Sequence, residues 1–150
     1  MIIRKGTIND MPAILNLIKE LAIFENEPYA VVVSTEDLVR DGFGENPLFT
    51  TFVAEVENEI IGMALFYYRF STWKGKTIHL EDLIVTENKR GTGAGFKLYA
   101  EIIKEGKKEN VRRIEWNVLD WNKPVSILLN FSSSRLVKIG CLIPTQWHCI

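Results

Sequence analysis

The chain has 150 residues, of which 47% are hydrophobic and 25% are charged, and its formal net charge is −1. This composition is typical of a soluble globular domain. The small net charge gives no support for a nucleic-acid or anionic-membrane partner, because such partners favour a basic face. No apolar run approaches the ~18 residues that a membrane span needs. The first ten residues lack the apolar core of a secretory signal, so we expect a cytoplasmic protein.

Both cysteines, Cys141 and Cys149, lie in the last ten residues. Two cysteines so placed do not form a disulfide framework. Together with the two histidines they show no zinc-ligand spacing, so we expect no metal site.

The chain opens with a short predicted strand over residues 1–6, followed by a predicted helix over 9–25. Asn9 or Asp10 can cap this helix, and Pro12 suits its first turn. Apolar residues recur there at the spacing of one helical face: Met11, Ile14, Leu15, Ile18, Leu21 and Ala22.

A second, shorter helix is predicted over residues 34–44. Ser34 or Thr35 can cap it, because both side chains accept hydrogen bonds from free N–H groups at a helix start. Gly42 or Gly44 is expected to end it.

The middle of the chain favours β-structure. Residues 48–70 alternate in the manner of two strands joined by a tight turn at Glu57–Asn58, and residues 76–86 predict a third strand. A helix over 93–108 and a strand over 112–120 follow. The order β-α-α-β-β-β-α-β indicates an α+β or mixed α/β sheet with helices packed on it.

A glycine-rich loop joins the strand at 76–86 to the helix that follows. Free N–H groups and the positive end of the helix dipole make such a junction a binding site for anions. Gly91, Gly93 and Gly95 let the backbone approach a phosphate closely, and Lys89 and Arg90 add positive charge. A plain glycine-rich turn is the alternative interpretation.

The loop does not fit the two commonest phosphate-binding motifs. A P-loop would need G-x-x-x-x-G-K-[ST], which is absent. A dinucleotide-binding loop would need a third glycine at position 96, which is occupied by Phe96.

The segment "RGTGAG" at 90–95 resembles the [QR]-x-x-G-x-[GA] loop of the GCN5-related N-acetyltransferase (GNAT) family, with Arg90, Gly93 and Gly95 at the motif positions. The resemblance covers residues 1–124. Further stretches resemble the diamine acetyltransferases and their thialysine-acetylating relatives in order and spacing: "NLIKELAIFE", "DLVRDGFGENP", "STWKGK", "LEDLIV" and "WNKP".

The resemblance implies a fold, a cofactor and a set of contacts. The fold is a mixed, mostly antiparallel twisted sheet flanked by helices, splayed beside the strand that precedes the glycine loop. The cofactor is acetyl-coenzyme A, and relatives of this type imply a homodimer. The implied cofactor contacts are Leu83, Ile84, Val85, Arg90, Gly91, Thr92, Gly93, Ala94, Gly95, Phe96 and Asn122.

Acetyl transfer to an amine requires that an ammonium group with a pKa near ~10 lose its proton. Glu81 and Asp82 lie on the strand that leads into the loop. Adjacent strand residues face opposite sides, so both carboxylates share a face only if the strand is bulged. The alternative is a pair of surface carboxylates bound to Lys76 or Lys89.

The resemblance assigns water-mediated proton removal to Glu81 and binding of a cationic substrate to Asp82 and Glu25. Trp73 is a candidate for packing against the substrate chain, although packing within its own loop explains it equally well. His79 fits a histidine on the strand surface better than a catalytic base.

The pattern breaks after Pro124. The family's general acid is a tyrosine in this region, and the chain has no tyrosine after Tyr99. Some of the codons that can encode "PVSILLN" and "VKIGCLI" would, in a shifted reading frame, encode residues that resemble those of the family. We therefore expect one domain over 1–150 whose residues 125–150 are either out of frame or truly divergent.

Three functions remain open from the sequence. The first is an acetyl-coenzyme A-dependent N-acetyltransferase acting by direct transfer on a small amine, such as a polyamine, a diamine or a thialysine-like amino acid. The second is an acyl-coenzyme A-binding homologue impaired by loss of the tyrosine. The third is an unrelated nucleotide-binding module.

Overall fold

A computed structural model describes residues 1–119 and 137–143, which form one mixed sheet and three α-helices. The strands lie in sequence order: β1 (Ile2–Lys5), β2 (Thr50–Val56), β3 (Glu59–Ser71), β4 (Gly75–Val85), β5 (Arg113–Leu119) and β6 (Val137–Ile143). The pairs from β1 to β4 are antiparallel, whereas β4–β5 and β5–β6 are parallel. The predicted element order and the mixed sheet are therefore confirmed.

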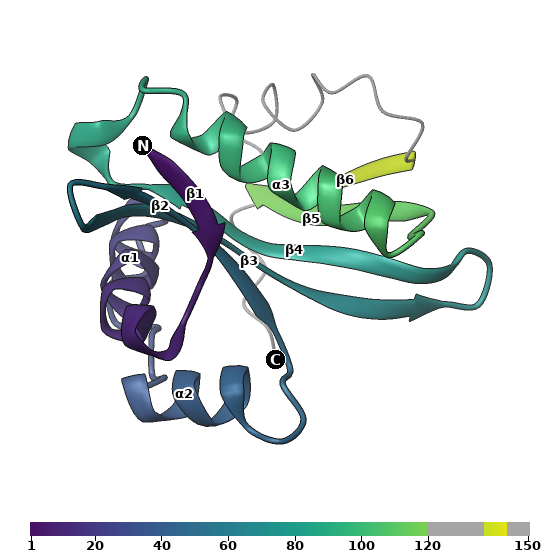
Figure 1. The fold of residues 1–150 in the computed structure, drawn as a ribbon, viewed down its shortest axis with the longest axis horizontal. Coiled ribbons are helices and arrows are strands. Elements are labelled where there is room, and N and C mark those ends of the chain that lie inside the picture. The colour runs from purple at the N-terminus through teal and green to yellow at the C-terminus, as the bar shows by residue number, and fades with distance from the viewer. Residues whose placement is uncertain (120–136, 144–150) are drawn as a thin grey trace.

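The helices cover both faces of the sheet (Figure 1). Helices α1 (Met11–Phe24) and α2 (Thr35–Phe43) lie on one face, and α3 (Ala94–Lys108) lies on the other. Each face of the sheet buries its own apolar cluster. Between α3 and the sheet, the cluster includes Phe66, Leu98 and Ile102. Between α1 and the sheet, it includes Met11, Ile14 and Met63. The two clusters fix which side of the sheet each strand residue faces.

The predicted N-cap is confirmed for α2 but not for α1. Ser34 caps α2 in a reciprocal capping box with Asp37, as predicted for a serine before a helix. Asp10 precedes α1 but does not cap it with its side chain. The Asp10 carboxylate instead accepts hydrogen bonds from Arg4 and from the Thr7 N–H, because a nearby guanidinium is a stronger partner than a helix terminus.

The β2–β3 hairpin turns at Glu57 and Asn58, as the sequence predicts. Both residues have positive φ angles, 52° and 64°. Two consecutive left-handed residues form the type of two-residue turn that matches the twist of antiparallel strands.

Two irregularities of β4 define the region that matters most for function. Leu65 of β3 pairs with Asp82, but the next residue, Phe66, pairs with Leu80, so Glu81 is the extra residue of a β-bulge. On the other side, β4 pairs with β5 only over Ile78–Leu80. From Glu81 onward, β4 pairs only with β3 among the described strands, which is the splay that the resemblance implies.

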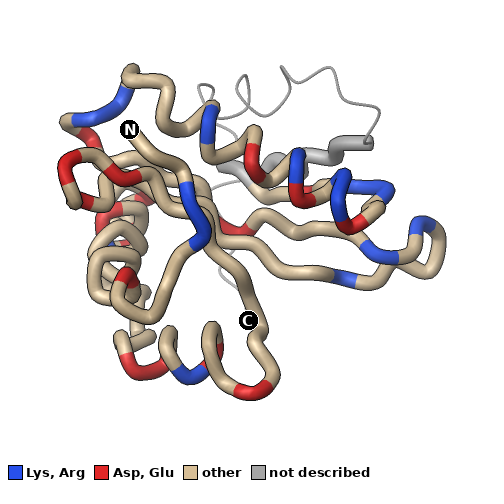
Figure 2. Tube along the Cα trace, viewed as in Figure 1, with Lys and Arg blue, Asp and Glu red and all other residues tan. Residues whose placement is uncertain are grey.

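Charged residues of both signs are interspersed along the exposed side of α3 (Figure 2). No helix within residues 1–119 is long and apolar enough to cross a membrane. Asn122, and the point near Pro124 where the sequence leaves the family pattern, lie outside the described residues.

Candidate active site

The bulge brings Glu81 and Asp82 to one face of the sheet. Asp82 pairs with Leu65, which belongs to the apolar cluster under α1. A Glu81 carboxylate oxygen lies 3.4 Å from Nε2 of His79, a residue that faces away from the α3 cluster. The strand therefore meets the condition that the sequence set for the two carboxylates to act together.

Glu25, directly after α1, completes a group of three carboxylates. Burial, followed by the negative charges of Glu81 and Glu25, raises the pKa of Asp82 to about 7. Partial burial also raises the pKa of Glu25. Like charges held close together favour protonation of one member or the binding of a cation.

Pairing with a strand lysine does not account for these carboxylates. Lys76 forms an ion pair with Glu109 at 2.5 Å and lies over the ring of Tyr68, near the far end of β4. The interpretation of Glu81 and Asp82 as ion-pair partners of Lys76 is therefore wrong.

His79 differs from the expectation of a surface histidine, since it is only 6% exposed. Its ring lies against that of Tyr67, with centroids 5.2 Å apart. Tyr67 is also hydrogen-bonded to Glu81, and burial followed by the Glu81 charge raises the pKa of the phenol. Sequence reasoning missed Tyr67 because a tyrosine in a strand is ordinarily explained by packing.

The glycine loop has the geometry of an anion site. Gly91 and Gly93 have φ angles of 79° and 81°, which L side chains rarely adopt, and a Cβ at either position would meet no atom within 4 Å. Gly93 precedes α3, whose start is not capped by any side chain of the described residues. The first N–H groups of a 15-residue helix thus remain available to an anion.

Neighbouring side chains brace this loop. Arg90 donates to the Val85 carbonyl at 3.2 Å and its guanidinium lies 5.0 Å from the centre of the Phe24 ring. The Thr92 hydroxyl donates to the Lys89 carbonyl at 2.8 Å. These contacts hold the loop against β4 and α1, while Gly91 and Gly93 stay exposed.

The other predicted contact residues divide by location. Leu83, Ile84 and Val85 continue the splayed part of β4 toward the loop, with Ile84 buried at 4% exposure. Ala94 and Gly95 are the first residues of α3, and Phe96 is exposed on its first turn.

Trp73 is not brought to the carboxylates. It lies at the tip of the β3–β4 hairpin with 88% of its surface exposed. Glu81 lies six positions beyond Gly75 along the strand, which corresponds to about 20 Å at ~3.3 Å per residue. Within one chain, Trp73 therefore lies too far away to contact a ligand held between Glu81 and Asp82.

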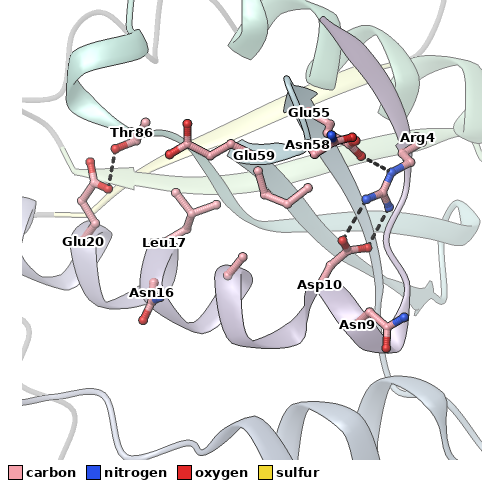
Figure 3. Close-up of a pocket in the computed structure, with 12 residues that line it drawn as sticks. Arg4, Asn9, Asp10, Asn16, Leu17, Glu20, Glu55, Asn58, Glu59 and Thr86 are labelled. Atoms are coloured by element: carbon pink, nitrogen blue, oxygen red, sulfur yellow. Dashed lines mark hydrogen bonds and ion pairs between the residues drawn. The ribbon is translucent and has the colours of Figure 1, made fainter.

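A second polar region lies between α1 and the β2–β3 turn, as a cavity of about 500 Å³ (Figure 3). Its wall includes four carboxylates, those of Asp10, Glu20, Glu55 and Glu59. Arg4 pairs with Asp10 and with Glu55, each at 2.7 Å. Glu20 accepts hydrogen bonds from the Thr86 hydroxyl and the Glu87 N–H. Most of the charged groups in the cavity wall therefore already have partners within the wall. Through Thr86, the wall extends to the residues that lead into the glycine loop.

Two features of this site are those of an acetyl-transferring enzyme. The mixed sheet splays beside grouped carboxylates, and one of its strands leads through a glycine loop into an uncapped helix. The chain belongs to the acetyltransferase (GNAT) family, whose model matches residues 12–127.

The chain is similar to named relatives in this family. It is 37% identical over 160 aligned positions to the thialysine N-epsilon-acetyltransferase of Bos taurus, covering 99% of this chain and 90% of that protein. It is 35% identical over 140 positions to the spermidine/spermine N(1)-acetyltransferase-like protein 1 of Homo sapiens, which covers 89% of this chain but only 20% of that protein.

The fold is shared with a predicted acetyltransferase of Clostridium acetobutylicum solved with acetyl-CoA, at a TM-score of 0.70 and 19% identity. That match covers 89% of this chain and 90% of the other.

Proposed function

We propose that this chain transfers an acetyl group from acetyl-coenzyme A to a primary amine of a small cationic substrate, such as a polyamine, a diamine or a thialysine-like amino acid. The observation that carries the proposal is the placement of Glu25, Glu81 and Asp82 beside the splayed edge of β4. The same strand runs directly into the glycine loop. Two of the three carboxylates, Glu81 and Asp82, thus lie on the strand that leads into the proposed anion-binding loop.

The loop residues fit the pyrophosphate of coenzyme A. The backbone from Gly91 to Gly95 and the free N–H groups of α3 are suited to the phosphates, with Lys89 and Arg90 adding charge. Leu83 to Val85 line the approach from the splay, and Thr92, Ala94, Phe96 and Asn122 complete the proposed contact set. Acetyl-coenzyme A, when bound, supplies the acetyl group as an activated thioester.

The three carboxylates bind the cationic substrate and remove a proton from its reacting amine. Glu81 accepts the ammonium proton through a water molecule, because an amine attacks only in its neutral form. Asp82 and Glu25 bind a second positive charge of the substrate, which orients the reacting amine toward the splay. Direct transfer in one site then depends mainly on positioning.

Substrate selection tests this proposal. In Asp82→Asn, the Michaelis constant for a diamine should rise more than that for acetyl-coenzyme A, since only the diamine loses a charge partner. Glu27→Gln, which neutralises a carboxylate two residues beyond Glu25, serves as the control. Equal increases for the diamine and for acetyl-coenzyme A would contradict a cation-binding role.

A second candidate function rests on the missing tyrosine. No tyrosine follows Tyr99 in the sequence, so the general acid that the family uses has no counterpart in position. A homologue of this kind would bind coenzyme A but release no thiol when an amine is added. Measurement of thiol release therefore separates the two candidates.

The oligomeric state and location also remain predictions. A homodimer is supported by the exposed aromatic side chains of Phe70 and Trp73 on the β3–β4 hairpin, which are 80% and 88% exposed. Sedimentation of the full chain measures this directly. A cytoplasmic location is proposed from the composition.

A further inference from the structure

A row of polar side chains crosses three strands behind Glu81. Tyr67 of β3 pairs with His79 of β4, and His79 pairs with Glu115 of β5, so the three lie directly opposite one another. The row lies on the face opposite the α3 cluster, since the neighbouring residues Phe66, Ile78 and Ile114 are buried under α3. The His79 side chain therefore has a polar neighbour on each adjacent strand, Tyr67 on β3 and Glu115 on β5.

One contact fixes the protonation pattern of the His79 ring. An Arg69 guanidinium nitrogen lies 3.3 Å from Nδ1 of His79 in a hydrogen bond. A guanidinium can only donate, so Nδ1 must be the acceptor and the neutral ring must carry its proton on Nε2. Nε2 is the ring nitrogen that faces the Glu81 carboxylate, at 3.4 Å.

Arg69 is itself held in place. Its guanidinium lies 2.6 Å from a carboxylate oxygen of Glu115, and Arg113 lies 3.0 Å from the other oxygen of the same carboxylate. A chain of contacts therefore runs from Arg113 through Glu115, Arg69 and His79 to Glu81. The charged and titratable groups that face the His79 ring come from all three strands: Tyr67, Arg69, Glu81 and Glu115.

We propose that His79 is a positioning residue for acetyl transfer, held by Arg69 in the tautomer whose Nε2–H points at Glu81. The proposal rests on the function proposed above. The Nε2–H and the Tyr67 hydroxyl limit the rotation of the Glu81 carboxylate. His79 keeps its proton throughout, and Glu81 alone exchanges a proton with the substrate. A contact of 3.4 Å is long, and catalytic contacts of this type commonly tighten when substrate binds.

Nitrogen NMR of the full chain tests the tautomer without any activity measurement. The wild-type His79 ring should show a protonated Nε2 and an unprotonated Nδ1. In Arg69→Met, which removes the donor, both neutral tautomers should be populated. Lys76→Met is the matched control, because it removes an ion-pairing cation from the far end of β4. A wild-type ring protonated on Nδ1 would overturn the proposal.

Kinetics test the positioning role. His79→Phe should lower kcat by about 10-fold to 10²-fold, the scale of a small misplacement of a catalytic group. The affinity for coenzyme A should stay unchanged, because the glycine loop is untouched.

His79→Gln separates positioning from packing, because its amide nitrogen can donate from near the position of Nε2. Its kcat should stay within a few-fold of the wild-type value. Equal losses in His79→Phe and His79→Gln, or no loss in either, would overturn the positioning role. A wild-type chain that acetylates no amine would instead contradict the proposed function, while the NMR result would still decide the tautomer.

Discussion

Glu20 of α1 accepts a hydrogen bond from the Thr86 hydroxyl at 2.9 Å (Figure 3), and its other carboxylate oxygen accepts from the Glu87 N–H at 2.8 Å. The two partners lie directly after β4, at the point where the chain turns toward the glycine loop. Phe24, one helical turn further along α1, packs against Arg90 of the same loop. Helix α1 therefore sets where the loop begins, although it contributes no predicted cofactor contact.

Removing this tether should weaken cofactor binding. Glu20→Ala loses two hydrogen bonds to the loop, each with a net worth of about 1 kcal/mol. We expect the affinity for coenzyme A to fall about 5- to 30-fold, as measured by calorimetry. Glu59→Ala is the matched control, because Glu59 lines the same cavity but does not hold the loop. Equal affinities in the two variants would show that the loop is positioned without α1.

The left-handed glycines provide a second test. Gly93→Ala and Gly75→Ala impose the same backbone strain, since both positions have φ near 80° and open space where the Cβ would lie. Each should lower stability by about 1–2 kcal/mol. Only Gly93→Ala should also weaken coenzyme A binding, because Gly75 lies at the tip of the β3–β4 hairpin.

Calorimetry with coenzyme A and with simple nucleotides measures this difference. Equal effects of the two substitutions on coenzyme A affinity would contradict a phosphate-binding loop. Tighter binding of a nucleotide than of coenzyme A would support the nucleotide-binding alternative.

Local sequence rules predicted most of the fold. The element order, the turn at Glu57–Asn58, the cap at Ser34 and the start of α3 after Gly93 all follow from periodicity, turn chemistry and capping. These features depend on residues within a few positions of one another. The splay beside β4 came from the resemblance to a known family, because periodicity does not show where two strands separate.

The parts of the site that were missed depend on partners far apart in the sequence. Asn9 or Asp10 was expected to cap α1, but the Asp10 side chain binds Arg4, which the sheet brings alongside. His79 was expected on the surface, but Tyr67 and Glu115 from neighbouring strands enclose it. The available signal for a buried polar row was a charged residue, Glu115, between the apolar residues Ile114 and Trp116.

The missing tyrosine leads to a prediction about rate. The wild-type chain should bind acetyl-coenzyme A yet transfer the acetyl group slowly, because the departing thiolate lacks its general acid. Loss of such a group typically costs about 10²- to 10⁴-fold, or roughly 3–5 kcal/mol of barrier. A chain whose residues after Pro124 are replaced by a family-like segment with its tyrosine should recover that factor, measured as thiol release. Full turnover by the wild-type chain would show that water or another group supplies the proton.

The carboxylate group should make stability depend on pH. Burial and the charges of Glu81 and Glu25 raise the pKa of Asp82 from 3.8 to about 7, so the folded chain holds this proton more tightly than the unfolded chain. Stability should therefore decrease as pH rises from about 4 to about 7 and change little above that through this group. Asp10 has the opposite effect on stability, because its hydrogen bonds with Arg4 lower its pKa to about 2. Its contribution to stability is lost as pH falls from about 4 to about 2.

Asp82→Asn removes the cost of ionising that carboxyl group. The variant should melt at the wild-type temperature near pH 4, where Asp82 is mostly protonated, and at a higher temperature at pH 8. The gain in stability should be on the order of 1–4 kcal/mol, the upper value being three pKa units at about 1.4 kcal/mol each. Asp10→Asn should instead destabilise the chain at pH 8. A gain for Asp82→Asn that persisted at pH 4 would assign the effect to packing. If the variant is both more stable and poorer at binding a diamine, the sequence carries a destabilising charge at Asp82 for the sake of its substrate.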